Sequence, residues 1–423
     1  MNILLIHQYF LEKDDGGGSR FNEMTRNWAE QGNDIEVLGG MVHYASGKKR
    51  DRYRGKYTFI DQFYERVRVI RCHVSEAYNA GFLGRLWGYF SFTLSATYAG
   101  LFKIERKPDV ILVTSPPLFV GITAYILAKL RRVPFVFEVR DLWPESAIDT
   151  GVLNNGLMIK AAYWFEAFIY KRATLINVLT PAFRDTLIQK KKVPAEKVIF
   201  IPNAADFTLS DAIIEDFDRE RFREEHGLAG KKVITYVGAH GVANHLIQVI
   251  ETAELLRDRP EVLFQLVGNG PQKSMLVEEA RERGLTNVKF VDSVPKMEVF
   301  KYILASDFGT SVLKKVDTFK TIYSNKTFDY MACSKPIFMA IDGVSRKLVE
   351  DAACGVYVAP ENPRDFADKI LQTIALPDTE LARQGQSGYA YAKQHFDRMR
   401  LADQYLTALK RAAGQLRSEP ISA

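Results

Sequence analysis

The sequence has few cysteines, no signal-like start, no low-complexity tract and no short repeat. Its 3 cysteines (Cys72, Cys333 and Cys354) are odd in number and lack metal-ligand spacing, which indicates reduced thiols in a cytoplasmic protein. The start, MNILLIHQYF, has no basic segment before its apolar residues and soon turns polar, so we expect a strand there and not a signal peptide. These absences favour an ordinary globular protein of the cytoplasm.

The composition is that of a soluble protein with a basic bias. A length of 423 residues suggests two domains of about 200 residues each. Hydrophobic residues make up 47% and charged residues 26%, both ordinary values. The net charge is +6 and the pI is about 8.9, which favours an anionic partner. That bias fits phosphate-bearing small molecules, acidic lipid and nucleic acid equally.

Apolar strands alternate with helical stretches in two successive blocks. The first block contains NILLIHQYF, DIEVLGG, PDVILVTSP, FVFEVRD and LINVLT, and the second contains KVITYVGAH, VLFQLVGNG, NVKFVD, DFGTSVL, PIFMAI and CGVYVAP. Near-continuous apolar strands separated by helices predict parallel sheets covered on both faces. We therefore expect an α/β protein with two doubly wound, Rossmann-like domains and a hinge near residues 203–210. The predicted domains are 1–205 and 206–390, and amphipathic helices in 391–423 are expected to pack back towards the first domain.

Glycines follow three of these strands, where doubly wound sheets bind ligands. Gly16, Gly17 and Gly18 follow the first strand, and the turns VGAHG and VGNG follow the first two strands of the second block. Such glycines let backbone N–H groups approach an anion at a helix N-terminus. Ser19 could equally be a plain N-cap, and a lone histidine such as His240 is usually structural. No Lys-Ser or Lys-Thr pair follows the glycines, which argues against an ATPase. Together the turns predict a cleft between the domains that binds an anionic ligand.

The stretch SNKTFDYMACSKP places a cation and a carboxylate on one helix face. Lys326 and Asp329 are three residues apart, so their side chains are neighbours on a helix. An exposed surface ion pair is the plain alternative, and such pairs contribute little stability.

Several motifs in register resemble the family 4 glycosyltransferases, which have the GT-B fold. They are YVGAHG, LVGNGP, NVKFVDSVPKMEVF, IPNAAD and SNKTFDYMACSKPIFMAIDG in the second half, and HQYF…GGGSRF, DVILVTSPP and VRDLWPES in the first. The chain is most similar to the subgroup that builds bacterial surface polysaccharides such as O-antigen and capsule, including transferases for amino-deoxy sugars of the N-acetyl-fucosamine type. The resemblance implies two Rossmann-like domains facing each other across a cleft. It also implies a UDP-sugar donor held by the second domain, an acceptor held by the first, and retention of anomeric configuration.

The resemblance also assigns roles to individual residues. A cation at Lys326 would stabilise the charge that grows on the leaving diphosphate, which lowers the transition state more than the ground state. Asp329 falls at the second Glu of the family's Glu-x7-Glu pair, which accepts hydrogen bonds from the ribose. The predicted donor-binding residues are Gly17, Gly18, His240, Gly241, Asn244, Gly268, Asn325, Lys326 and Asp329.

This chain also departs from the family pattern. Thr321 stands where the first Glu of the pair is expected, and Ser334 replaces a usual glycine. The segment AHGVANHL lacks the Arg and Lys that many members place after the YVG strand. The first change leaves the donor sugar open. The missing cations would transfer neutralisation of the diphosphate to Lys326, to backbone N–H groups and to His240.

We expect no catalytic metal and no cofactor. Asp216 and Asp218 fit an Asp-x-Asp metal motif, but they lie in the charged, helix-like segment IIEDFDRERFREEHG and not at a strand end. In the first domain, EVRDLWPES supplies the remaining catalytic candidates, Glu138, Arg140 and Asp141.

These three residues follow a strand, with Arg140 where many family members carry a His. A carboxylate there could orient or deprotonate the acceptor hydroxyl, and Arg140 could hold a phosphate. A structural Arg–Asp pair that closes the strand is the alternative. His7, at the end of the first strand, is a further candidate.

Two neighbouring stretches bear on membrane association. Residues 47–57 form a basic run with Lys48, Lys49, Arg50, Arg52 and Arg54, and residues 81–104 form an aromatic-rich helix. The strand that follows almost at once argues against a membrane span. A helix in the membrane interface, with its basic flank on anionic lipid, predicts a peripheral protein on the inner face of the plasma membrane. The alternative is a buried helix beside a solvated loop.

The function expected from the sequence is a retaining glycosyltransferase of bacterial surface polysaccharide synthesis. It would move a sugar from a UDP-sugar to a lipid-linked or saccharide acceptor, and no nucleic acid partner is expected. Two alternatives stay open: a nucleotide-sugar epimerase of the same architecture, and a catalytically degenerate nucleotide-sugar-binding protein, which Thr321 motivates.

Overall fold

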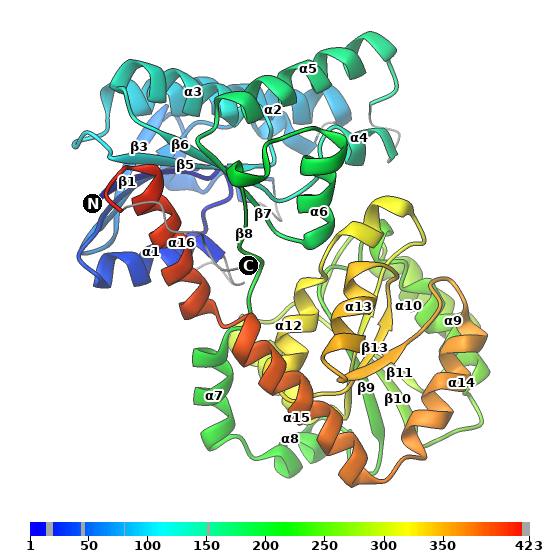
Figure 1. Cartoon of the computed structure of the whole chain (residues 1–423). Coiled ribbons are helices and arrows are strands. Elements are labelled where there is room, and N and C mark those ends of the chain that lie inside the picture. The colour runs from blue at the N-terminus through cyan, green and yellow to red at the C-terminus, as the bar shows by residue number, and fades with distance from the viewer. Residues whose placement is uncertain (14–19, 44–46, 80, 150–152, 417–423) are drawn as a thin grey trace. The chain divides into compact units, whose positions relative to one another are not determined.

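The computed structural model describes residues 1–13, 20–43, 47–79, 81–149 and 153–416. Figure 1 shows the two compact α/β units into which the chain divides: Met1–Pro202 with Met399–Ala423, and Asn203–Arg398. The chain thus passes into the second unit at the start of the predicted hinge. It leaves after residue 398 and not after 390, because the helix that ends the second unit continues to His395.

The first unit contains an eight-stranded sheet in the order β3-β4-β2-β1-β5-β6-β7-β8. Every neighbouring pair is parallel except β3 and β4, which are antiparallel. The strands are β1 Asn2–Ile6, β2 Asp34–Gly40, β3 Thr58–Tyr64, β4 Val67–Cys72, β5 Val110–Ser115, β6 Phe135–Val139, β7 Leu175–Val178 and β8 Val198–Phe200.

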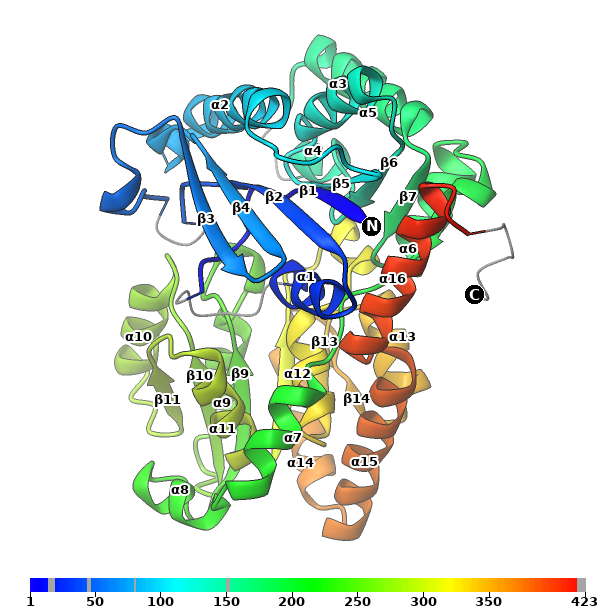
Figure 2. The ribbon, with the colours of Figure 1, turned by 90° about the vertical axis from the view of Figure 1, so that its left-hand side faces the viewer.

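Helices cover both faces of this sheet. Helices α2, α3 and α5 lie side by side on one face, and α1 and α16 lie on the other (Figures 1 and 2). The indole Nε1 of Trp28 in α1 donates to the Ala402 carbonyl in α16 at 2.8 Å, which fixes the C-terminal helix to this unit. The helices are α1 Arg20–Glu30, α2 Gly81–Phe102, α3 Val120–Arg131, α4 Glu145–Asp149, α5 Gly156–Arg172, α6 Pro181–Asp185 and α16 Arg398–Ala412.

The second unit is built on a six-stranded, all-parallel sheet in the order β11-β10-β9-β12-β13-β14. One apolar cluster packs α9, α10 and α14 on one face, and another packs α7, α11, α12, α13 and α15 on the opposite face. The strands are β9 Lys232–Val237, β10 Val262–Val267, β11 Val288–Val291, β12 Phe308–Val312, β13 Ile337–Ala340 and β14 Gly355–Tyr357. The helices are α7 Phe207–Asp216, α8 Arg219–Glu225, α9 Ile247–Leu255, α10 Lys273–Glu282, α11 Lys296–Ala305, α12 Asn325–Ala332, α13 Val344–Asp351, α14 Pro363–Ile374 and α15 Asp378–His395.

The prediction of two α/β domains with parallel sheets is confirmed, and each strand named from the sequence is present. The sequence pattern missed β3, β4 and β8. Strand β4 reads VRVIRC, and its two arginines make the segment look exposed. Arg71 is nevertheless only 1% exposed, because its guanidinium donates to the carbonyls of Phe10 and Leu11. Strand β8 has only 3 residues, too short to show a pattern.

Candidate functional site

Two glycine turns of the second unit meet at the carboxyl ends of β9 and β10. Gly238 follows β9 with a φ of +131°, and Gly268 follows β10 with a φ of +146°. The Gly238 amide donates to the Val267 carbonyl at 2.9 Å, and a Cβ added to Gly268 would lie 1.9 Å from the Gly238 oxygen. No residue larger than glycine fits at position 268, because of both the backbone conformation and the close approach. The two turns therefore form one rigid backbone surface.

Lys326 reaches this surface from the first turn of helix α12. Its Nζ lies 4.8 Å from the ring centroid of Tyr236, and its Cε is 3.4 Å from where a Cβ on Gly238 would be. The Ser324 hydroxyl is 3.5 Å from the ammonium. Burial lowers the pKa of Lys326 to about 8, and the Asp329 carboxylate opposes this shift.

No acidic side chain of the described residues forms an ion pair with Lys326. The alternative of a surface Lys326–Asp329 ion pair is therefore not what the structure contains. A half-buried cation without a counter-ion is unfavourable unless a ligand supplies the negative charge. Its place at a helix N-terminus, beside two strand ends, favours an anion as that ligand.

Asp329 lies one turn further along α12 and is half-buried. Burial raises its pKa to about 6; Lys296 and Lys326 lower it, and Asp206 raises it. At neutral pH it is therefore mostly ionised and can accept hydrogen bonds from hydroxyl groups. Asn325, which begins the helix, is exposed and accepts from the Asn203 side chain at 2.6 Å. The structure thus brings Gly238, Gly268, Lys326 and Asp329 into one region of the second unit.

The other predicted donor-site residues are placed differently. The His240 side chain is 0% exposed, and burial together with Lys273 lowers its pKa to about 4. His240 therefore carries no positive charge at neutral pH, and the expectation that it helps to neutralise a diphosphate fails on this physical ground. Gly241 and Asn244 remain partly exposed in the same turn, with the Asn244 amide hydrogen donated to the Gly241 carbonyl at 3.0 Å. Gly17 and Gly18 lie outside the described residues.

Sequence reasoning missed three residues that shape this region. Tyr236 supplies the ring beneath the Lys326 ammonium, and the ammonium of Lys273 fastens the Gly268 turn by donating to its carbonyl at 2.9 Å. Lys296 acts on Asp329 from helix α11. Tyr236 and Lys273 stand within the motifs YVG and VGNGPQK, so their position next to the glycines was a usable signal.

In the first unit, Glu138 is buried near the carboxyl end of strand β6. Its carboxylate is 0% exposed, accepts from the Asn177 amide at 2.9 Å and from Arg20 at 3.4 Å, and lies 3.9 Å from Arg140 Nε. The Arg20 guanidinium also donates to the Ile201 carbonyl at 2.8 Å. Glu138 thus joins β6, β7, α1 and the chain after β8. This geometry favours a structural role for Glu138.

Arg140 and Asp141 are more accessible than Glu138. Both are partly exposed just after β6. His7 lies just after β1, and its pKa is well below the ordinary value because the ring is buried and because the positive charge of Arg140 acts on it. His7 is 2% exposed and shares a hydrogen bond with Thr114 at 2.7 Å. Burial raises the pKa of Asp141, although it accepts hydrogen bonds from Ser146 and Leu142. Arg140 and Asp141 can contact a ligand, whereas His7 is a buried neutral side chain.

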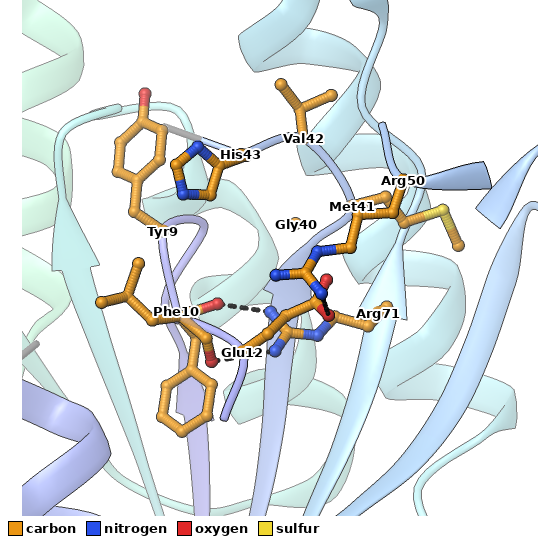
Figure 3. A pocket seen from close by; sticks show the side chains of 10 residues that line it. Tyr9, Phe10, Glu12, Gly40, Met41, Val42, His43, Arg50 and Arg71 are labelled. Atoms are coloured by element: carbon orange, nitrogen blue, oxygen red, sulfur yellow. Dashed lines mark hydrogen bonds and ion pairs between the residues drawn. The ribbon is translucent and has the colours of Figure 1, made fainter. Parts of the chain in front are cut away.

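A pocket lies at the carboxyl ends of β1, β2 and β4 (Figure 3). It is lined by residues 9–12 and 40–43 together with Arg50 and Arg71. The guanidinium of Arg50 pairs with Glu12 at 3.2 Å. The pocket therefore offers an aromatic ring from Tyr9 and polar groups of both charge signs. No sequence motif predicted this pocket, because its walls come from four separate segments.

The Asp-x-Asp match has a structural explanation. Asp216 ends helix α7, and the Asp218 carboxylate caps helix α8 by accepting from the Arg221 amide at 3.0 Å. Within the described ranges, no group of three His, Cys, Asp or Glu side chains could hold a metal ion. Metal independence stays a prediction.

Aromatic and aliphatic side chains are exposed along α2 and α5. On α2 they follow one another at helical spacing, and Trp87, Leu94 and Phe102 are 56%, 59% and 69% exposed. On α5, Leu157 and Trp164 are 78% and 69% exposed. We call the outer surface of α2, α3 and α5 the aromatic face.

The aromatic face lacks exposed acidic groups. Among the residues of α2, α3 and α5 only Glu166 is acidic, and it is buried and paired with Lys191 at 2.6 Å. By contrast, three arginines of the predicted basic run have acidic partners. These pairs are Arg50–Glu12 at 3.2 Å, Arg52–Asp61 at 3.5 Å and Arg54–Asp51 at 3.1 Å. No helix in the described part of the chain is long and apolar enough to cross a bilayer.

Two family models match successive parts of the chain. Residues 15–204 match the glycosyl transferase 4-like domain, and residues 218–391 match the glycosyl transferases group 1. A relative named as the colanic acid biosynthesis glycosyl transferase WcaI of Escherichia coli (strain K12) is 26% identical over 97% of this chain and 100% of its own length. An alpha-D-kanosaminyltransferase of Streptomyces kanamyceticus is 23% identical over 60% of this chain and 64% of its own.

Solved structures share the fold across the whole chain. The crystal structure of HepE from Anabaena in complex with UDP superposes with a TM-score of 0.70 at 17% identity, covering 97% of this chain and 100% of that one. Sucrose-phosphate synthase from Thermosynechococcus elongatus gives a TM-score of 0.73 at 14% identity, covering 97% and 99%. At these identities the likeness establishes the fold.

The buried position of Glu138 predicts that its loss destabilises the protein. Glu138→Gln removes the negative charge that faces Arg20 and Arg140, so we expect the free energy of unfolding to fall by about 3–5 kcal/mol, the usual loss when one partner of a buried ion pair is removed. Urea denaturation at neutral pH measures this. The matched control is Asp141→Asn, a more accessible carboxyl nearby, which should change stability by less than about 1 kcal/mol. A Glu138→Gln protein as stable as the parent would favour the catalytic alternative instead.

Proposed function

The chain belongs to the family 4 glycosyltransferases of the GT-B fold, and on this premise we propose that it is a retaining, metal-independent glycosyltransferase that moves a sugar from a UDP-sugar to a lipid-linked saccharide. The name of the WcaI relative, which mentions colanic acid biosynthesis, supports a place in bacterial surface polysaccharide synthesis. The HepE structure with bound UDP supports a uridine nucleotide as the donor's leaving group.

The observation that carries the proposal is the uncompensated Lys326 ammonium. It lies over Tyr236, against Gly238 and at the first turn of α12, with no described carboxylate in ion-pair contact. A diphosphate would supply the missing negative charge. It would also meet N–H groups of the first helical turn, a helix end that attracts anions.

This placement explains how the residues would promote transfer. As the bond between the anomeric carbon and the diphosphate oxygen breaks, its electron pair goes to that oxygen and its negative charge rises. A fixed cation there stabilises the transition state more than the bound donor. Asp329, one turn along the same helix, would accept hydrogen bonds from the ribose hydroxyls, which do not change during the reaction.

We assign the acceptor to the first unit. Arg140 and Asp141 are partly exposed after β6, and the raised pKa of Asp141 makes its carboxylate a better proton acceptor for the attacking hydroxyl. The pocket in Figure 3, with Tyr9, Glu12 and Arg50, offers a ring and charged groups suited to sugar hydroxyls.

The aromatic face supports a lipid-linked acceptor and peripheral attachment to the inner face of the plasma membrane. Its exposed Trp and Leu side chains suit the acyl boundary of a bilayer, and the absence of exposed acidic groups suits anionic headgroups. Because the arginines of the basic run are paired, exposed lysines of α5, such as Lys160 and Lys171, are better candidates for contact with lipid phosphates.

One experiment separates this function from its alternatives. Purified protein is incubated with labelled UDP-sugars and membrane extract, with and without EDTA. We expect the label to pass to a lipid fraction, with the anomeric configuration retained and the rate unchanged by EDTA. An epimerised donor without transfer would identify the epimerase alternative, and binding without turnover the degenerate one. Activity abolished by EDTA and restored by a divalent ion would contradict the metal-free mechanism.

Lys326 and Asp329 should fail in different ways. Lys326→Ala should lower kcat by roughly a hundredfold or more, the usual effect of losing one preorganised electrostatic group. Asp329→Ala should act mainly on the donor KM, by about tenfold, because ribose contacts are equal in ground and transition states. Steady-state kinetics at neutral pH measure both.

The pH profile provides the control for Lys326. Its ammonium is charged below its pKa of about 8, so kcat/KM for the donor should fall as pH rises through about 8. Lys326→Arg keeps the charge at all these pH values and should lose this alkaline limb. Near-wild-type kinetics for a folded Lys326→Ala protein would exclude the proposed role.

The aromatic face should bind anionic membranes. We expect co-sedimentation with phosphatidylglycerol-containing vesicles that weakens as salt is added. Trp87→Ser combined with Trp164→Ser should weaken binding by about a hundredfold or more, since each buried aromatic contributes about 1.5–3 kcal/mol. Leu255→Ser, at a side chain 50% exposed on the second unit, is the matched control and should bind like the parent. Equal binding to neutral and anionic vesicles would refute the electrostatic part, and an unaffected double variant would refute the apolar part.

A further inference from the structure

An ionic cluster surrounds Asp206, close to where the chain passes into the second unit. One carboxylate oxygen of Asp206 caps helix α7 by accepting from the Leu209 amide at 3.2 Å. The other accepts from Lys296 Nζ at 2.6 Å and from Arg398 Nη1 at 3.2 Å. The Lys296 and Asp206 side chains are only 19% and 11% exposed, so this ion pair is little screened by water.

The same cluster joins the two ends of the second unit. The Ala205 amide donates to the Phe396 carbonyl at 2.9 Å, and Arg398 donates to the Ala204 carbonyl at 3.3 Å. The Asn203 side chain donates to Asn325 at the start of α12 at 2.6 Å. The chain ends of this unit are therefore fastened to each other and to the helix that carries Lys326 and Asp329.

Lys296 occupies the junction between this cluster and the nucleotide site. It is the first residue of α11, and α11 packs against both α7 and α12. Asp206 immediately precedes α7, and Asp329 lies on α12. The Lys296 ammonium thus acts on two carboxylates: it donates directly to Asp206 and acts electrostatically on Asp329.

Few other charges reach Asp329. Among the described residues they are Lys296, Asp206, which opposes it, and Lys326 on α12 itself. Tyr330 and Cys333, which follow Asp329, stay neutral because burial raises their pKa values. Helix α15 and strand β12 also pack against α12, but no charged group of theirs acts on this carboxylate.

We propose that Lys296 is a positioning residue of the nucleotide site, which Asp206 holds in place and which keeps the Asp329 carboxylate charged and ready to accept hydrogen bonds from a nucleotide's ribose. This inference rests on the proposed function, since it assumes that Asp329 contacts the donor. A carboxylate is an acceptor at both oxygens only when ionised. Burial works against that state, and Lys296 is the largest electrostatic influence that favours it.

The test is UDP binding by calorimetry as a function of pH, with each variant compared with the parent at the same pH. In the parent, Asp329 loses its charge as pH falls through about 6. Lys296→Met keeps the length of the side chain but removes its charge, so the midpoint should rise by about one pH unit or more. UDP should then bind about fivefold more weakly than to the parent at pH 6, and within about twofold of the parent at pH 8.5.

Two matched variants make the result specific. Lys301→Met removes another lysine of α11, one paired with Glu298 at 2.7 Å. The ratio of its UDP dissociation constant to that of the parent should stay near one at every pH. Lys296→Arg keeps the charge and should restore the parent's profile.

The outcomes distinguish this inference from the function on which it rests. A folded Lys296→Met protein whose ratio to the parent is the same at all pH values would overturn the inference, whether that ratio is one or much lower. Asp329→Asn tests the premise: if it binds UDP like the parent, Asp329 is not in the nucleotide site and the proposed site itself fails. Weaker binding by Asp329→Asn with a flat Lys296→Met ratio would overturn the role of Lys296 alone.

Discussion

Parallel strands covered on both faces leave only their ends for polar chemistry, and the rest of this molecule depends on that constraint. All the residues of β5 and β10 are buried, so an unpaired polar side chain within them would be costly. Some polar residues do lie inside the sheets and have partners there: the Gln265 amide donates to the Thr235 hydroxyl at 3.2 Å, and the Asn177 amide donates to Glu138. Accessible chemistry is therefore confined to the segments that follow the strands, where Gly238, Gly268 and Arg140 lie.

Burial brings the pKa values of the two charged groups of α12, Lys326 and Asp329, closer together. It lowers the pKa of the Lys326 ammonium to about 8 and raises that of the Asp329 carboxylate to about 6. Both groups are still mostly charged between these values, but neither charge is strongly stabilised by the protein alone. Such a site is stabilised most by a ligand that brings a negative group to the cation and hydroxyl groups to the carboxylate.

The first unit separates its two kinds of surface. Two of its buried carboxylates are paired, Glu138 with Arg20 and Glu166 with Lys191. Its outer helices, in contrast, expose aromatic rings and contribute no exposed acidic side chain of their own. The residues proposed to bind the acceptor thus follow strands of the sheet, and the face proposed to meet lipid lies on helices that cover it.

The sequence by itself determined the fold class and the family. Continuous apolar strands such as VILVTS and VLFQLV must be covered on both faces. This pattern is local, so it can be recognised without knowing any tertiary contact. The position of Lys326 and Asp329 on one helix also followed from spacing alone. The sequence pattern did not predict strand β4, because Arg71 is buried only through hydrogen bonds to carbonyls about sixty residues away in the chain.

Only the tertiary structure decided which of the candidate residues are accessible and what charge they carry. It buried Glu138 and neutralised His240, and it showed that Arg50 and Arg54 have acidic partners. It also brought Lys296 and Asp206 close to Asp329, although their motifs are far apart in the sequence. The physical reason is that burial and electrostatic interaction depend on distances between separate elements, and these distances are fixed by packing and not by any local pattern of residues.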